Sequence, residues 1–415
     1  MCTESGHVLT RTRITKSGQN VSGKTFKFQR LPQFQRITQV CANSTGGFAA
    51  LRTEYQPKPI EVRGHSLGED LAEIQPYLAI SLVDALKGGA PSSPHLDGSP
   101  RQYDDVVDDF DVEIDIRNLQ NFFDVLDPKN LTQKGQNLSF NPAFSVAHGA
   151  DVLLYLPTGE VFPSHRTILA GRSRLFCAVL SGCKVTPNEK RNISLELVDP
   201  PVTTPSGHQV FHLALGGCQP MSVLIALTFL YSDELLAVWD RRIATVLEDR
   251  LEAFKIDPGR IKTDLRALAE VLELPTLSFA LKSPSKRPPQ PSLGISMQEL
   301  FQSAQTSGQL DPSLSARAPD VVLQLADRDV FCHSAILRAR SLFFASFFDE
   351  EVWTIRRRNG NMLTIDMKHL DWRVMEHVLS FICWGAEDLF DTLDFATSVD
   401  EVLEFIFSVM AAAVS

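Results

Sequence analysis

The sequence contains one twelve-residue stretch twice: HRTILAGRSRLF at residues 165–176 and HSAILRARSLFF at residues 333–344. Six of the twelve positions are identical, and the two stretches lie 168 residues apart. In both, apolar residues recur at a spacing of three to four, which predicts a helix with one buried face. The duplication therefore predicts two domains of the same fold.

Each stretch follows a pair of short apolar segments that predicts a β-hairpin. The first hairpin, DVLLYL-PTGE-VFPSH, begins at Asp151, and the second, DVVLQL-ADRD-VFCH, begins at Asp320. Beyond the helices, ISLELV (193–198) and MLTIDM (362–367) predict a strand in each repeat. Further helices are predicted at 220–236 and, as two helices broken near Pro275, at 260–282 in the first repeat, and at 372–385 and 399–415 in the second. A repeat of this length indicates tandem α+β domains rather than a solenoid.

The remaining segments predict strands and linkers. Residues 1–55 predict strands. Apolar and polar residues alternate in HVLTRTRIT (7–15), and 37–53 predicts two strands on either side of the Gly46-Gly47 turn. Ser66 can cap a helix over 66–86 whose first turn is acidic, and the seven acids of 104–115 predict a solvated face or loop. We expect five segments, with the linker at 283–315 marked by its proline and serine content. These are strands at 1–55, a linker with a helix and an acidic run at 56–145, a first domain at 146–282, a second linker at 283–315 and a second domain at 316–415.

The hairpin and the helix after it resemble the signature of the BTB/POZ domain. In the second repeat one residue fewer separates the Asp from the His, and Arg338 stands where the first has Ala170. The residues that match the signature in the first repeat are Asp151, Phe162, His165, Arg166, Ile168, Leu169, Ala170, Arg172, Ser173 and Phe176. Those in the second repeat are Asp320, Phe331, His333, Ile336, Leu337, Arg340, Ser341 and Phe344.

Residues 1–55 resemble one blade of a β-propeller of the regulator-of-chromosome-condensation type, through CTESGHVLTRT and ITQVCANSTGGFAALRTEY. A propeller followed by two BTB domains is similar to the inhibitor-of-Bruton-tyrosine-kinase class of proteins. One blade cannot bury both of its faces alone. This resemblance implies that the chain is a C-terminal fragment or a shortened gene model, with its second BTB domain truncated at the C-terminal end.

Composition limits the partners and the compartment. The chain has 415 residues, 44% of them hydrophobic, and a net charge of −10, which argues against nucleic acid or an anionic membrane as the main partner. No apolar run reaches the length of a membrane span, and the N-terminus lacks the apolar segment of a signal peptide. The seven cysteines form no C-x-x-C pair, which is typical of free thiols in a reducing compartment. We expect a cytoplasmic or nuclear protein.

An enzyme is the least favoured interpretation. Asp151, His165 and Ser173 form an Asp–His–Ser set, which Asp320, His333 and Ser341 repeat. The serine is not on a G-x-S-x-G turn, and on one continuous helix it would lie about 12 Å from the histidine. We expect these polar residues to hold the hairpin to the helix by hydrogen bonds. The sequence therefore predicts no catalytic residue, no metal site and no cofactor.

The BTB resemblance implies a protein-interaction function. The predicted role is a substrate adaptor for a cullin-type E3 ubiquitin ligase, in which the propeller would hold an unknown protein substrate. The alternative is a scaffold that only oligomerises, through self-association or through pairing of the two BTB domains within one chain.

The aromatic stretch FFASFFDEEVW (343–353) is the candidate partner-binding segment. Cullin binding in the family favours an apolar residue, any residue and then Glu, after this helix. Phe348-Asp349-Glu350 fits that pattern four residues early, whereas Val352 and Trp353 stand at the aligned positions and Thr354 replaces the Glu. The candidate partner-binding residues are Phe348, Asp349, Glu350, Val352 and Trp353.

Overall fold

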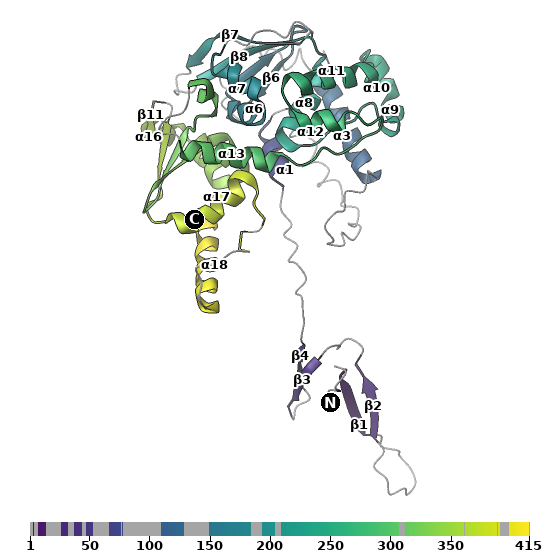
Figure 1. The fold of residues 1–415 in the computed structure, drawn as a ribbon, viewed down its shortest axis with the longest axis vertical. Helices are drawn as coiled ribbons and strands as arrows, with labels where there is room; N and C mark the ends of the chain where they lie inside the picture. Colours follow the sequence, from purple (N-terminus) through teal and green to yellow (C-terminus); the bar gives the residue numbers. More distant parts are fainter. Residues whose placement is uncertain are drawn as a thin grey trace, which may run out of the picture. The chain divides into compact units, whose positions relative to one another are not determined.

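The computed structural model describes residues 3, 7–13, 26–31, 37–43, 47–52, 66–75, 77, 109–127, 149–183, 193–203, 209–306, 312–360, 362–387, 389–390 and 398–414. The chain divides into two compact units, residues 1–63 and 64–415 (Figure 1). Both of the duplicated segments lie in the second unit, which contains all the helices of the described residues.

The first unit consists of two β-hairpins. Strand β1 (Leu9–Arg13) pairs antiparallel with β2 (Phe26–Arg30), and β3 (Ile37–Ala42) pairs antiparallel with β4 (Phe48–Arg52). The strands predicted at 7–15 and 37–53 are confirmed, whereas β2 was not predicted. The four strands form two separate two-stranded sheets, so the described residues show no propeller blade, which would be one four-stranded sheet.

The second unit contains two four-stranded sheets with the same topology, one in each repeat. Strand order is β6-β5-β8-β7 in the first and β10-β9-β12-β11 in the second. In both, the hairpin strands are antiparallel, the first hairpin strand has a parallel neighbour, and an antiparallel strand closes the edge. The strands are β5 (Val152–Tyr155), β6 (Val161–Ser164), β7 (Ser194–Thr203), β8 (Gln209–Gly216), β9 (Val321–Gln324), β10 (Asp329–Cys332), β11 (Arg358–Asn359) and β12 (Met362–Asp366).

This topology corrects two details of the predicted repeat. The segment at 193–198 belongs to the edge strand β7, and the counterpart of β12 is β8, which was not predicted. The strand register pairs Phe162 with Leu154 and Val330 with Leu323, so Val330 is the counterpart of Phe162. Phe331 therefore does not occupy the signature position predicted for it. The turn of the second hairpin is one residue shorter, which moves the aromatic residue to the other face of the strand.

The twelve-residue stretch folds as two short helices rather than one. In the first repeat α6 (Arg166–Arg172) and α7 (Arg174–Leu180) meet at Ser173, whose backbone is extended (φ −135°, ψ 128°). In the second, α14 (Ser334–Arg340) and α15 (Leu342–Asp349) meet at Ser341 with nearly the same dihedrals (φ −139°, ψ 119°). Both serines accept a bond from the backbone N–H three residues later and so begin a new helix.

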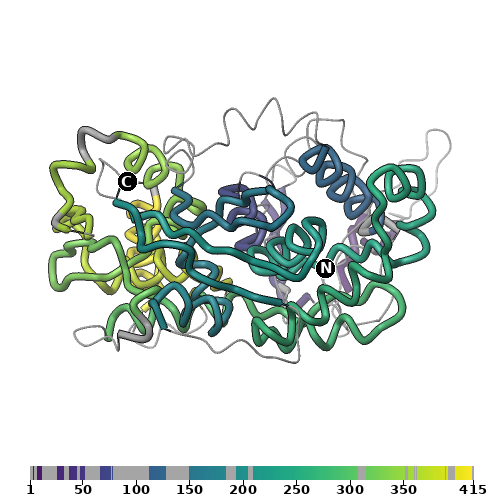
Figure 2. The backbone as a smooth tube through the Cα atoms, turned by 90° about the horizontal axis from the view of Figure 1, so that it is seen from above, coloured from purple at the N-terminus to yellow at the C-terminus, as the bar shows by residue number. Residues whose placement is uncertain are grey.

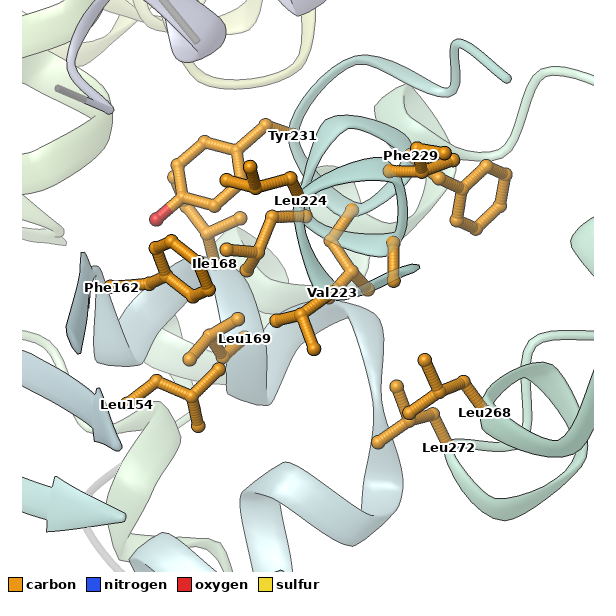
Figure 3. Packing of buried hydrophobic residues seen from close by; sticks show 14 of the residues in the cluster. Leu154, Phe162, Ile168, Leu169, Val223, Leu224, Phe229, Tyr231, Leu268 and Leu272 are labelled. Atoms are coloured by element: carbon orange, nitrogen blue, oxygen red, sulfur yellow. The ribbon is translucent and has the colours of Figure 1, made fainter. Parts of the chain in front are cut away.

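The first repeat is completed by α8 and four further helices, and α8 is buried on nearly every side, chiefly by α11 and α1 (Leu67–Glu73). Figure 3 shows Leu224 and Tyr231 of α8 beside Phe162 of the hairpin and Ile168 of α6. Figure 2 shows the two repeats side by side, and in Figure 1 α9, α10 and α11 lie on the side of the first repeat away from the second. These helices are α8 (Pro220–Ser232), α9 (Arg241–Val246), α10 (Glu248–Ala253), α11 (Pro258–Val271) and α12 (Pro275–Ala280).

The second repeat has three further helices. Helix α16 (Glu351–Arg357) follows α15 directly, α17 (Trp372–Trp384) corresponds in place and length to α8, and α18 (Val399–Val414) packs on α17. The predicted helices at 372–385 and 399–415 are confirmed. A second apolar cluster, built from β9, β12, α17 and α18, forms the core of this repeat.

The predicted linkers contain ordered helices. Helix α1 (Leu67–Glu73) begins at the predicted Ser66 cap, and α3 (Asp109–Leu126) contains part of the acidic run. Asp115 in that run is buried and pairs with Lys286 at 2.7 Å, so the prediction of a solvated run is wrong at this residue. The interval 283–315 holds α13 (Leu293–Gln305) and the short 3-10 helix η2 (Pro312–Arg317). Helix α13 packs on both repeats, because its face with Met297, Leu300 and Phe301 is apolar.

Candidate protein-interaction site

The signature aspartate holds the hairpin to the following helix in both repeats. The carboxylate of Asp151 accepts a hydrogen bond from the Arg166 backbone N–H at 2.6 Å and pairs with the Arg166 guanidinium at 3.3 Å. The carboxylate of Asp320 accepts from the Ser334 backbone N–H at 2.7 Å and also binds the Ser334 hydroxyl. Burial raises the pKa of Asp151 to about 6. The positive charge of Arg166 favours the ionised carboxylate and only partly offsets this shift. An unpaired N–H at a helix start is thus satisfied in each repeat.

The signature histidine is buried in both repeats and bonds to different partners. The backbone N–H of His165 donates to the Tyr231 hydroxyl at 2.8 Å, and its ring Nδ1 lies 2.9 Å from the same oxygen. The ring Nε2 of His333 donates to the Arg317 carbonyl at 3.0 Å. Arg317 in turn donates to the Ala170 carbonyl in the first repeat at 2.9 Å. His333 therefore belongs to a chain of hydrogen bonds that joins the two repeats.

The signature serine and the apolar signature residues make contacts that stabilise the fold. Ser173 donates its hydroxyl to the Leu272 carbonyl at the end of α11, at 2.9 Å. Leu169, Phe176, Leu337 and Phe344 are all buried in the two apolar clusters. The Asp, His and Ser side chains of the rejected catalytic set thus bind backbone or neighbouring helices, which is the arrangement of residues that fix a fold.

The signature arginine links each repeat to a helix outside the repeated sequence. Arg172 forms a buried ion pair with Asp233 and donates to Ser292 and Ser296 of α13 at 3.0 and 3.2 Å. Arg340 forms a buried ion pair with Asp70 of α1. Burial lowers the pKa of Arg172, and the Asp233 carboxylate opposes this shift. The sequence pattern identified both arginines but gave no indication of these partners.

Helices α1 and α13, which we call the S-L-G helices, are a third repeated element. Each begins with Ser-Leu-Gly, at 66–68 and at 292–294, and this short match is the signal that could have revealed them. Helix α1 packs on α8 and α14, whereas α13 packs on α17 and α6. Each S-L-G helix therefore contacts the long helix of one repeat and the signature helix of the other.

The contacts of the two S-L-G helices match residue by residue. A Cβ at Gly68 would lie 2.9 Å from the backbone of Ser232, and a Cβ at Gly294 would lie 3.1 Å from the carbonyl oxygen of Trp384. Ser232 and Trp384 are the last residues of α8 and α17.

The far ends of the S-L-G segments also match. Gln75 donates its side-chain amide to the Pro163 carbonyl at 2.8 Å, and Gln305 donates to the Phe331 carbonyl at 2.6 Å. Pro163 and Phe331 occupy the same register position in the two hairpins. The two repeats therefore pair within one chain in a near-symmetric way, with each S-L-G helix shared between them.

The predicted partner-binding segment lies at the end of α15 and the start of α16. Phe348 is half-buried against the second cluster, while Asp349 and Glu350 are exposed. Asp349 pairs with Arg338. Val352 and Trp353 lie in α16, and their side chains are outside the described residues.

The aromatic helix α15 is more exposed than its counterpart α7. Leu342 and Phe343 are 88% and 49% exposed. Phe347 and Phe348 are half-buried, whereas Val179 and Leu180 at the matching positions of α7 are buried. The second repeat thus presents apolar side chains beside two carboxylates, which is a surface suited to a protein partner.

The described residues bear on two other kinds of site. No group of three or more His, Cys, Asp or Glu side chains there could hold a metal ion. Within the same part of the chain, no helix has both the length and the apolar character needed to cross a membrane.

Comparison with known families matches residues 140–258 and 311–407 to the BTB/POZ domain, which is more than half of the chain. The chain therefore belongs to the BTB/POZ domain family, whose domains are typically non-catalytic modules for protein association. It is 25% identical over 420 residues to BTB/POZ domain-containing protein 1 of Schizosaccharomyces pombe (strain 972 / ATCC 24843). The match covers the whole of this chain, and the chain spans 28% of the length of that relative.

Proposed function

We propose that the chain is a substrate adaptor for a cullin-type ubiquitin ligase, and that the ligase scaffold docks on the second repeat. The observation that supports this most is the accessible surface of α15, where Phe343, Phe347 and Phe348 lie beside the exposed Asp349 and Glu350. An apolar centre with charged residues at its edge is the usual composition of a docking surface. The matching surface of α7 buries Val179 and Leu180, which favours the second repeat.

In this proposal the first unit belongs to the substrate-holding part. The hairpins β1–β2 and β3–β4 would form part of a propeller of the regulator-of-chromosome-condensation type, as in the class that the sequence resembles. The paired BTB repeats would then be a rigid support between the substrate and the ligase.

A capture assay with purified cullin tests the proposal. The full chain is expected to retain cullin at micromolar concentration, and a chain carrying Phe348→Asp with Val352→Asp is expected to retain at least about tenfold less. Val246→Asp is the matched control, because Val246 is an exposed apolar residue of the first repeat (60% exposed). Absence of capture by the unaltered chain, or equal loss in the control, would contradict the adaptor role.

The alternative is a scaffold without a ligase role. The sharing of α1 and α13 between the repeats supports it, because the pairing within the chain requires no other protein. This alternative is favoured if the unaltered chain captures no cullin while remaining folded by circular dichroism.

A further inference from the structure

The segment 283–292, between α12 and α13, is rich in proline and is neither helix nor strand. Its sequence is SPSKRPPQPS, with prolines at 284, 288, 289 and 291. Proline fixes φ at about −65°, and the residue before a proline is restricted to extended conformations. Every residue from 287 to 291 is a proline or precedes one. These constraints favour a left-handed polyproline II helix, which has about three residues per turn.

Burial along the segment follows this period of three. One row of side chains faces the protein and is buried or half-buried, and its members are Lys286, Pro289 and Ser292. The next row is exposed to solvent, and its members are Ser285, Pro288 and Pro291. The segment therefore has one edge packed on the protein and one edge open to a partner.

The inner row is anchored by contacts with carboxylates. The Lys286 ammonium pairs with Asp115 at 2.7 Å, and the Lys286 backbone N–H donates to Asp240 at 2.9 Å. The backbone N–H and the hydroxyl of Ser292 donate to Asp233 at 2.6 and 3.0 Å. Both ends of the extended segment are thus fixed, and a ligand that is already ordered loses little conformational entropy when it is bound.

A basic and aromatic surface adjoins the exposed prolines. Phe279 of α12 is 45% exposed. The Arg287 guanidinium lies 4.5 Å from the centre of the Phe279 ring, and the Lys282 ammonium lies 5.8 Å from it, which are the distances of cation–π contacts. The chain as a whole has a net charge of −10, so this local positive charge is a distinguishing feature of the segment.

We propose that Pro288 and Pro291 form the centre of a binding site for an SH3-type domain. The two prolines have the P-x-x-P spacing, which is recognised by grooves lined with aromatic side chains. Pro289 points toward the protein, whereas Gln290 on the third row is exposed and leaves a second edge for the groove. Positive charge at the start of the segment favours a groove with carboxylates at one end. The site uses no residue of α15, so it does not depend on the proposed ligase role.

Binding of the full chain to an array of purified SH3 domains tests the proposal. At least one domain is expected to bind with a dissociation constant of about 1 to 100 µM, and Pro288→Ala with Pro291→Ala is expected to weaken that binding at least about tenfold. Pro284→Ala is the matched control, because Pro284 is an exposed proline outside the P-x-x-P pair. Binding by none of the domains, or an equal loss in the control, would overturn the proposal and leave the prolines as stiffeners of the connection.

Two further measurements separate binding from folding and from the adaptor role. Lys282→Glu changes an exposed side chain and is expected to weaken binding at low ionic strength and to reduce its salt dependence. An affinity that Lys282→Glu leaves unchanged would contradict the acidic groove. Cullin capture and the melting curve of the double proline variant should both match those of the unaltered chain, so a failure here is distinct from a failure of the adaptor role.

Discussion

The two BTB repeats share the polar hairpin–helix joint and differ in what covers it. In the first repeat α8 is buried nearly all round, and α11 ends against Ser173. In the second repeat α17 has exposed positions, Phe381 among them at 44%, where its counterpart Phe229 is 1% exposed. The comparison shows that the signature fixes the local fold, whereas later helices decide how much surface remains for partners.

The largest expected effect comes from the buried arginine of the first repeat. Arg172→Met removes the ion pair with Asp233 and the bonds to Ser292 and Ser296, and leaves a buried carboxylate without its cation. We expect the free energy of unfolding to fall by about 3–5 kcal/mol. Urea unfolding followed by circular dichroism measures it. A loss below about 1 kcal/mol would show that Arg172 does not hold α13 to the first repeat.

The S-L-G helices offer a matched pair of glycines. Gly68→Ala puts a methyl group 2.9 Å from the Ser232 backbone, which cannot move without shifting α8, and we expect a loss of about 1–3 kcal/mol. Gly294→Ala meets a single carbonyl oxygen at 3.1 Å and is expected to cost less, since the better helix propensity of alanine offsets about 1 kcal/mol equally in both variants. Thermal unfolding should therefore separate the two variants. Equal melting temperatures would contradict the close approach at Gly68.

Alanine substitution of the two signature serines should cost different amounts of stability. Both serines cap a helix, but Ser173 also donates to the Leu272 carbonyl. Ser173→Ala loses a helix cap and also leaves the Leu272 carbonyl without its donor, with an expected cost of about 2 kcal/mol. Ser341→Ala loses the cap to the Phe344 N–H, at about 1 kcal/mol. The difference is measured by urea unfolding under identical conditions. The reverse order would show that α11 does not stabilise the joint.

The smallest expected effect is a pH dependence from His333. Burial lowers the pKa of His333 below its usual value near 6.5, so the unfolded chain binds the proton first as the pH falls. The contribution of His333 to stability is therefore present above pH about 6.5 and is lost below it, at no more than about 1.4 kcal/mol per pH unit. Urea unfolding of the unaltered chain and of His333→Gln at about pH 7.5 and 5.5 isolates the contribution of His333 to the pH dependence of stability. A pH dependence that the two proteins share would assign it to other groups.

Much of the fold was predictable from the duplicated sequence, and the failures have local causes. The hairpins, the strand at 362–367 and the helices at 372–385 and 399–415 followed from periodicity and turn residues. The break at Ser173 was missed because the apolar spacing continues across it, although a serine can end one helix and cap the next. Phe331 was assigned by identity, whereas a turn one residue shorter shifted the register.

The sharing of α1 and α13 between the repeats was missed for a different reason. Helix α13 was not predicted because it lies next to a Pro- and Ser-rich stretch, whereas a helix that begins at Ser66 was predicted within the first linker. Their role depends on contacts with both repeats, which a single sequence does not reveal. The buried pair Asp115–Lys286 is also a tertiary contact between two predicted linkers. Charge runs alone favour solvent exposure, so tertiary pairing overrides the local pattern there.

A double-mutant cycle on Asp70 and Arg340 tests the central claim, that the S-L-G helices are shared between the repeats. Asp70 belongs to α1 and Arg340 to the second repeat, and their ion pair is buried, with side-chain exposures of 14% and 3%. If α1 is shared, Asp70→Ala and Arg340→Ala should be non-additive in the free energy of unfolding, with a coupling of about 1–3 kcal/mol. Additivity within about 0.3 kcal/mol would contradict the pairing of the repeats through α1.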